Sequence, residues 1–282
     1  MESKAIIKNN KNRNQIRRII RLKPVLPYVE MHVVDHCNLN CKGCSHFSPI
    51  ADELFTDINE FTSDLQQLSR LVSNIEVIRL MGGEPLLHPN ITDFIHSTKF
   101  LFPNSDVHIV SNGVLLPTMT NEFWNTCRQN SICIDLTIYP PFVEKEKTWI
   151  EIARSNRVKV RIAEKPNFSA IINSRGDSET KRISEKCIFP GFAMVRQGKL
   201  YHCWMPALVH YFNRQYDESI PNKDYLEIYD QKITGWDLLS QIEKGSETCK
   251  YCTSGWHNVP FFQWTKSTHN KAEWDVASSF VN

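Results

Sequence analysis

The stretch Tyr28–Cys44, YVEMHVVDHCNLNCKGC, decides the fold of this chain. Its first half, Tyr28–Asp35, is rich in apolar and β-branched residues and predicts a strand. Three cysteines follow at once, separated by three and then by two residues. Three thiolates in so short a loop can hold three corners of a cubane iron–sulfur cluster, and they leave its fourth iron open to another ligand. A structural zinc site more often has two Cys-x2-Cys pairs, so this spacing favours an iron–sulfur cluster.

Strand-like and helix-like segments alternate on the C-terminal side of this stretch. Further strands are expected at Ile75–Met81, Val107–Ser111, Ile132–Tyr139 and Val158–Ala163, and helices at Asp57–Val72, Thr92–Phe100, Asn121–Arg128 and Val143–Ser155. Alternation at this spacing is typical of βα units, whose strands run parallel in a sheet or barrel. The predicted fold class is therefore α/β.

Two short motifs stand at the expected ends of strands. Gly82-Gly83-Glu84-Pro85 ends the second strand and Ser111-Asn112-Gly113 ends the third. Glycine lets a backbone approach a ligand closely, and ligand sites of α/β barrels lie at the carboxyl ends of the strands. Together with Cys-x3-Cys-x2-Cys after the first strand, these motifs resemble the radical S-adenosylmethionine (SAM) family.

The resemblance implies a [4Fe–4S] cluster on Cys37, Cys41 and Cys44, with the amino and carboxylate groups of SAM on the open iron. In the family, the reduced cluster cleaves SAM to methionine and a 5′-deoxyadenosyl radical, which takes a hydrogen atom from the substrate. The residues expected to bind SAM stand at the ends of strands: Gly82, Gly83, Glu84, Pro85, Ser111, Asn112 and Thr137.

The chain departs from the family pattern at one position. Radical SAM loops usually carry an aromatic residue just before the third cysteine, and this chain has Gly43 there. The adenine contact is therefore left unassigned, with His46 and Phe47 as the alternatives. Among the SAM-binding residues, Glu84 is expected to accept a hydrogen bond from the SAM ammonium group.

A second set of cysteines lies in the C-terminal third: Cys187, Cys203, Cys249 and Cys252. Their pattern, Cys-x10-Gly-x4-Cys followed by Cys-x2-Cys, resembles the cluster-binding half of SPASM domains, called the twitch domain. A hairpin is expected around Gly198, between Phe192–Arg196 and Lys199–His202. Four thiolates complete a second [4Fe–4S] cluster without an open iron. A zinc site with four cysteine ligands is the main alternative.

Side chains on a strand alternate between its two faces. In Ile132–Tyr139 the aliphatic residues should face the covering helices, and the remaining residues should face the lumen. The same alternation in the other strands gives an inward-facing set: Glu30, His32, Arg79, Met81, His108, Cys133, Asp135, Thr137, Tyr139, Lys159 and Arg161. Buried charges need partners. Either these side chains pair with one another, or a small polar substrate such as a sugar or aminocyclitol meets them.

The expected architecture is a partial (β/α)6 radical SAM barrel with a small C-terminal auxiliary-cluster domain of the twitch type. We assign residues 1–27 to a basic arm, 28–180 to the barrel and 181–282 to the auxiliary-cluster domain and tail. A short helix is expected over Trp236–Lys244, whereas residues 165–186 are expected to be polar and poor in helix.

Several reactions are compatible with this layout, and the candidate catalytic residues are Arg79, Cys133 and Tyr139. The first is an oxidation in which the auxiliary cluster accepts an electron, as in the aminocyclitol dehydrogenases of antibiotic biosynthesis, which share the compact layout. The second is an epimerisation with Cys133 as hydrogen donor, and the third is peptide modification. A non-enzymatic iron–sulfur redox sensor would not need the Gly82–Pro85 motif.

Composition limits the surroundings and partners of the chain. Nine cysteines, an odd number, argue against a disulfide framework and for metal binding in a reducing compartment. The chain has no apolar run long enough for a membrane span and no secretory signal, so a cytoplasmic location is expected. Residues 1–23 hold eight of the 33 Lys and Arg residues and one of the 31 acids. This arm is expected to be largely solvated and could dock flavodoxin or ferredoxin as electron donor; nucleic acid is an improbable partner of the acidic remainder.

Overall fold

The computed structural model describes residues 2–164, 167–187, 191–256, 259 and 261–279. Its helices are α1 Glu2–Ile19, α2 Ile58–Leu71, α3 Ile91–Leu101, α4 Asn121–Gln129, α5 Glu146–Ser155, α6 Thr180–Lys186, α7 Trp204–Tyr216, α8 Gly235–Glu243 and α9 Val276–Ser279. Its strands are β1 Val25–Val34, β2 Asn74–Gly82, β3 Asp106–Ser111, β4 Cys133–Ile138, β5 Lys159–Glu164, β6 Asn167–Ser169, β7 Ala193–Arg196, β8 Lys199–Tyr201, β9 Tyr225–Glu227 and β10 Phe261–Gln263.

One large sheet organises the chain, with the strand order β5-β4-β3-β2-β1-β7-β8-β9. Strands β1 to β5 are parallel to one another, and β7 pairs in parallel with the other side of β1. Strands β8 and β9 then continue the sheet in antiparallel fashion. The predicted α/β fold with a barrel-like parallel core is confirmed. Because β7 occupies the place beside β1, the C-terminal part of the chain shares the main sheet with the core.

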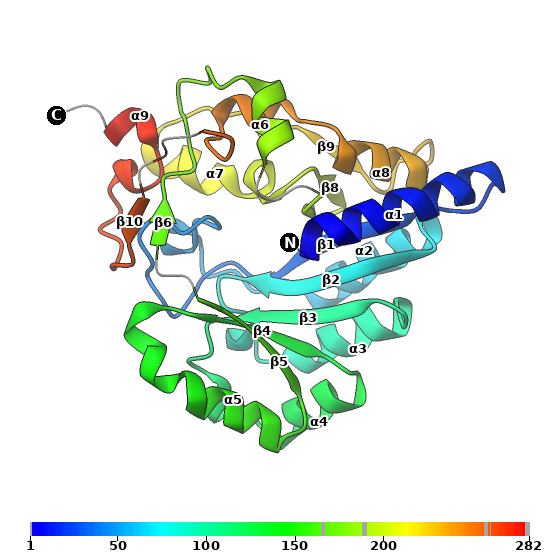
Figure 1. Ribbon diagram of the computed structural model, residues 1–282, viewed down its shortest axis with the longest axis horizontal. Coiled ribbons are helices and arrows are strands. Elements are labelled where there is room, and N and C mark those ends of the chain that lie inside the picture. The colour runs from blue at the N-terminus through cyan, green and yellow to red at the C-terminus, as the bar shows by residue number, and fades with distance from the viewer. Residues whose placement is uncertain (1, 165–166, 188–190, 257–258, 260, 280–282) are drawn as a thin grey trace.

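The predicted alternation of side chains along the strands is confirmed on the helix-covered face. Ile134 and Leu136 of β4 are fully buried in the main hydrophobic core, together with Phe123 and Trp124 of α4. Figure 1 shows α3, α4 and α5 along one side of the strands, with α6, α7 and the C-terminal elements gathered over the other. Strand β5 is the edge of the sheet, and most of its residues are exposed, so the barrel is open there.

The basic N-terminal segment forms helix α1, most of whose described residues are exposed, and two buried asparagines attach it to the start of β1. Asn10 and Asn14 of α1 are only 3% and 4% exposed. The Asn14 amide donates to the carbonyl of Val25 at 2.8 Å and accepts from its N–H at 2.9 Å. Arg18 lies over the ring of Trp236 in α8. Asn14, which looks like a surface residue in the sequence, instead forms hydrogen bonds with the backbone of Val25, the first residue of β1.

The hairpin predicted around Gly198 is confirmed as β7 and β8. Gln197 and Gly198 both have positive φ, 50° and 72°, which suits a two-residue turn between twisted strands. Helix α7, which starts directly after Cys203, was not predicted, and α6 forms inside the stretch that was expected to be poor in helix. Among the described residues, none of the helices has the length and hydropathy needed to cross a membrane.

Candidate functional site

A cavity lies where the parallel strands end, and many predicted site residues line it. These are Cys37, Cys41, Cys44, Gly82, Gly83, Ser111, Asn112, Thr137 and Tyr139. His46, one alternative for the adenine contact, and Met81, predicted to face the lumen, also line it, together with residues that were not predicted as site residues: Leu39, Ser45, Ser48, Val110 and Phe168. The cavity therefore joins the cysteine loop after β1 to the ends of β2, β3 and β4. This is the edge at which ligands of parallel α/β proteins bind.

The first cysteine set suits a metal cluster that needs thiolates. Burial and the nearby charge of Glu84 raise the pKa of the Cys37 thiol, so a cation is needed to keep it deprotonated there. The Leu39 N–H lies 3.4 Å from Cys37 Sγ, and the Asn112 amide lies 3.6 Å from it. Such donors stabilise thiolates and tune clusters held by them. The donor set thus fits an iron–sulfur cluster.

The cysteine loop is covered by the C-terminal end of the chain, which local sequence did not indicate. Trp264 Nε1 donates to Cys41 Sγ at 3.1 Å, and Trp274 Nε1 donates to the Cys44 carbonyl at 2.8 Å. The ring of Phe262 packs against Gly43, where a Cβ atom would lie 2.5 Å from it. The space beside Gly43 is thus filled by an aromatic ring from β10. A contact over more than two hundred residues leaves no mark in the spacing of the cysteines.

The glycines of the Gly82–Pro85 motif are required by the backbone around them. A Cβ atom on Gly82 would lie 1.7 Å from the Val34 carbonyl oxygen, and one on Gly83 would lie 2.0 Å from that of His36. Gly82 also has φ +151°, which L side chains rarely adopt. The end of β2 can therefore touch the end of β1 only with glycine at these positions.

Glu84, which follows β2, is hydrogen-bonded to the end of β3. Its side chain is fully buried and accepts from the Ser111 hydroxyl at 2.8 Å, the Asn112 N–H at 2.8 Å and the Leu86 N–H at 3.1 Å. Burial raises the pKa of Glu84 to about 7, against the lowering effect of these donors. Three donors leave room for one more on the carboxylate. Glu84 and Pro85 do not line the cavity itself.

The second cysteine set is assembled from separate elements. Cys187 follows α6, Cys203 precedes α7, and Cys249 and Cys252 lie in and after the short 3-10 helix Glu247–Tyr251. Burial raises the pKa of Cys203, and the charges of the other three cysteines raise it further. The four thiols are thus near enough for their charges to act on one another. Backbone N–H groups of Ser246 and Ser254 approach Cys249 and Cys252 at 3.4 Å. Four thiols, two of them beside N–H donors, can hold a metal cluster or a zinc ion.

Arg79 and Cys133 are not among the residues that line the cavity, and lie beside Asp135 instead. The Asp135 carboxylate contacts Arg79 at 2.8 Å, His108 at 2.8 Å and Arg161 at 3.0 Å. Burial opposes a charge on His108, but hydrogen bonds with Asp135 and Cys133 outweigh it and raise its pKa to about 10. The alternative in which inward-facing charges pair with one another thus holds for this group.

Tyr139 and Phe168 form the aromatic wall of the cavity. Their rings are stacked, with centroids 6.0 Å apart and planes 15° apart, and Phe168 in turn stacks on Phe262. Phe168 belongs to β6, which pairs with β10. The wall therefore depends on the same C-terminal segment that covers the cysteine loop. Phe47, one alternative for the adenine contact, is fully buried in a hydrophobic cluster, whereas His46 lines the cavity.

Comparison with known proteins finds similarities over part of the chain. The model of the Radical SAM superfamily matches residues 31–162. A GTP 3′,8-cyclase of Microcystis aeruginosa is 27% identical over 150 residues, which are 47% of this chain and 44% of that protein. A GTP 3′,8-cyclase of Clostridium acetobutylicum is 33% identical over 100 residues, 34% of this chain and 30% of that protein. The chain thus spans less than half the length of these relatives.

A structural similarity extends over more of the chain. The crystal structure of BtrN in complex with AdoMet and 2-DOIA covers 82% of this chain and 94% of that protein, with 19% sequence identity and a TM-score of 0.50. At that identity the similarity concerns the fold alone.

Proposed function

We propose, on the premise that residues 31–162 are a radical SAM domain, that this chain is an enzyme that oxidises a small polar substrate. The observation that carries the proposal is the single cavity shared by three cysteine thiols and the ends of β2, β3 and β4. Cluster and SAM would meet in this cavity, at the edge of the sheet where the radical chemistry of the domain belongs.

The residues proposed to hold the cluster and to bind SAM are those that line the cavity or support its lining. Cys37, Cys41 and Cys44 would hold a [4Fe–4S] cluster, and Ser111 and Asn112, held in place by Glu84, would contact SAM. Gly82, Gly83 and Thr137 line the same cavity. When bound, the cluster supplies the electron that cleaves SAM into methionine and a 5′-deoxyadenosyl radical. Tyr139 and Phe168 would shield this radical from water with an aromatic wall.

We assign the second cysteine set an auxiliary [4Fe–4S] cluster that accepts an electron. Oxidation of an alcohol would remove two hydrogens from the substrate. One would leave its carbon as a hydrogen atom taken by the 5′-deoxyadenosyl radical, and the other would leave its oxygen as a proton, while a cluster on the four cysteines would accept one electron. A cluster with four protein ligands has no open iron and suits electron transfer. A flavodoxin or ferredoxin would supply the electron that cleaves SAM.

The surroundings of Cys133 support oxidation over epimerisation. A hydrogen donor must reach the substrate carbon, but Cys133 does not line the cavity among the described residues. Its thiol lies within 4.8 Å of ligand atoms of His108 and Asp135, in the ion-pair group beneath. A buried cysteine in such a position is more often a packing residue.

Anaerobic turnover of the reconstituted protein with SAM, dithionite and a set of aminocyclitols and sugars tests the proposal. We expect 5′-deoxyadenosine to form and one of the compounds to yield a product two hydrogens lighter. Failure to form 5′-deoxyadenosine under any condition would contradict the proposal. A product of unchanged mass that carries deuterium from D₂O would replace oxidation by epimerisation.

A further inference from the structure

A buried amide group on α1 has a hydrogen-bond donor without a partner. Nδ2 of Asn10 forms no hydrogen bond among the residues that the structure describes, although Asn10 is only 3% exposed. A buried donor that stays unpaired costs free energy, and in native proteins such an atom often faces a bound group. The surroundings of this amide therefore indicate what it could bind.

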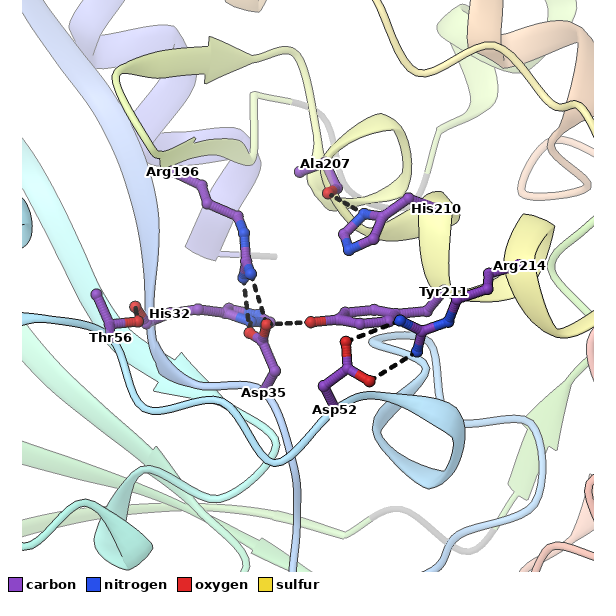
Figure 2. Close-up of polar contacts among 9 residues, drawn as sticks. All are labelled: His32, Asp35, Asp52, Thr56, Arg196, Ala207, His210, Tyr211 and Arg214. Atoms are coloured by element: carbon purple, nitrogen blue, oxygen red, sulfur yellow. Dashed lines mark hydrogen bonds and ion pairs between the residues drawn. The ribbon is translucent and has the colours of Figure 1, made fainter.

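The buried carboxylate of Asp35 shows the usual case, in which the protein supplies the partners itself. Figure 2 shows this carboxylate between Arg196 of β7 and Tyr211 of α7. Arg196 donates to both carboxylate oxygens, at 2.7 and 2.6 Å, and the Tyr211 hydroxyl donates at 2.5 Å. The Nδ1 of His32 lies 2.9 Å away. A carboxylate with this many donors needs no ligand, whereas the Asn10 amide has a donor to spare.

The orientation of the Asn10 amide follows from Asn14, one turn further along α1. Oδ1 of Asn14 accepts from the Val25 N–H at 2.9 Å, and its Nδ2 donates to the Val25 carbonyl at 2.8 Å. These backbone partners identify the two atoms, because an N–H can only donate and a carbonyl can only accept. Nδ2 of Asn14 also donates to Asn10 at 2.6 Å, so the atom that accepts there is Oδ1 of Asn10. The remaining atom of Asn10 is its NH2 group, which is a donor.

Asn10 lines a cavity next to the second cysteine set. The cavity has a volume of about 100 Å³, and Cys187 lines it together with Ile7 and Lys11 of α1. His202, the residue before Cys203, lies in the same wall. The unpaired amide and one of the four thiols therefore border the same small space.

Helix α1 is held over this cavity by contacts along its length. Ile7 packs against Gly191, where a Cβ atom would lie 3.2 Å from the Ile7 Cδ1. Further along the helix, Arg18 lies over the ring of Trp236 in α8. These contacts fix the position of Asn10 between them.

We propose that α1 forms part of the auxiliary-cluster site, where Asn10 donates a hydrogen bond to a sulfur atom of the cluster on the side of Cys187. Backbone N–H groups already approach Cys249 and Cys252 at 3.4 Å. Such donors surround thiolate-bound clusters and tune them. Asn10 adds a side-chain donor from the other end of the chain. This inference rests on the proposed function, which assigns an auxiliary cluster to the second cysteine set.

The hydrogen bond makes the auxiliary cluster a better electron acceptor. The reduced cluster carries one more negative charge than the oxidised cluster, so an N–H donor stabilises the reduced form more and raises the reduction potential. In the proposed oxidation, the cluster accepts an electron from the substrate, and a higher potential favours that step. Asn10 thus tunes the electron acceptor without contacting the substrate.

An EPR-monitored redox titration of the reconstituted full chain tests the inference. It compares the wild type with Asn10→Leu, which removes the donor at similar volume, and with the control Asn9→Leu, at an exposed position of the same helix. In Asn10→Leu we expect a lower potential of the auxiliary cluster. At a fixed applied potential, its ratio of reduced to oxidised form should fall by roughly 2- to 10-fold, as expected for one hydrogen bond. The potential of the SAM-binding cluster, and both potentials in Asn9→Leu, should keep their wild-type values.

The direction of the shift separates a lost hydrogen bond from a displaced helix. If α1 moved away, water would reach the cluster and stabilise its more negative, reduced form, which raises the potential. A higher potential of the auxiliary cluster in Asn10→Leu therefore overturns the inference. An unchanged potential overturns it too, and would mean that the Asn10 amide donates to water in the cavity.

A second variant covers the case in which Asn10→Leu loses the auxiliary cluster. Asn10→Asp keeps the Oδ1 acceptor for Asn14 and replaces the donor by a negative charge, so the potential should fall further than in Asn10→Leu. Should neither variant retain the cluster, pulsed EPR of the wild type with ¹⁵N in its asparagine side chains decides. Coupling between a labelled amide and the reduced auxiliary cluster is expected, and its absence overturns the inference.

Metal content, measured before any titration, separates this inference from the proposed function. Zinc or no metal at the second cysteine set would refute the electron acceptor of the proposed function, and this inference would fall with it. Two iron–sulfur clusters together with an auxiliary potential that Asn10→Leu does not lower would overturn this inference alone.

Discussion

The two cysteine sets are built in opposite ways. The first lies in one short loop after β1, and distant residues complete its surroundings: Asn112 approaches Cys37, and Trp264 donates to Cys41. The second gathers thiols from separate elements, and its N–H donors, such as Ser246 beside Cys249, are close in sequence. The comparison shows that the ligands of a compact motif can be predicted from sequence, whereas the distant residues that surround them cannot. For a dispersed set, the fold is needed to see that its members come together.

The largest expected effect separates the two sets by function. Replacing Cys37, Cys41 and Cys44 together by Ala should abolish SAM cleavage, because no iron would remain open to SAM. Replacing Cys249 and Cys252 by Ala should leave SAM cleavage in place and stop substrate oxidation. Chromatography of 5′-deoxyadenosine and of the substrate product measures both. Loss of SAM cleavage in the second variant, with its iron at the first set intact, would break the proposed division.

The next effect concerns Glu84. Glu84→Ala should weaken SAM binding by roughly 10- to 100-fold, because Ser111 and Asn112, which line the cavity, lose their common acceptor and hydrogen bonds to a charged group contribute about 1.5–3 kcal/mol. Iron content should not change. Calorimetry on the reconstituted variant measures the affinity, with Glu122→Ala as a matched control. An unchanged affinity would remove Glu84 from the SAM site.

A smaller effect connects α1 to the second set. Ile7 and Asn10 of α1 line a cavity together with Cys187, and Asn14 satisfies both backbone groups of Val25. Asn14→Ala should lower the free energy of unfolding by about 1–3 kcal/mol, because it leaves buried backbone groups unpaired. Asn9→Ala, an exposed change on the same helix, is the control. Equal Tm values for the two variants would contradict the docked position of α1.

The smallest effect is a shift in reduction potential. Trp264→Phe removes the N–H donor to Cys41, and a thiolate without that donor stabilises the reduced cluster less. The potential of the SAM-binding cluster should fall by about 20–60 mV, corresponding to roughly 0.5–1.5 kcal/mol for one hydrogen bond. The reduction potential of the auxiliary cluster should stay constant. In the control variant Trp236→Phe, the potentials of both clusters should stay constant. An EPR-monitored redox titration that finds no shift would make Trp264 a packing residue only.

The sequence predicted local features of the fold well and long-range contacts poorly. The parallel strands and the faces of their side chains could be predicted from periodicity, because the alternation that includes Ile134 and Leu136 lies within one short stretch of sequence. The docking of α1 did not follow, because Asn14 looks like a surface residue until Val25 lies beside it. The cover over Gly43 did not follow either, since Phe262 belongs to the far end of the chain. Pairing of Arg79 with Asp135 depended on side-chain positions that periodicity leaves open.

One measurement tests most directly that the chain holds two clusters of which one is open to SAM. It combines the metal content of the anaerobically reconstituted protein with EPR spectra of its reduced form before and after SAM is added. The account predicts about eight irons per chain, no stoichiometric zinc, and two cluster signals of which SAM changes only one. About four irons together with one zinc, or two signals that SAM leaves unchanged, would contradict it.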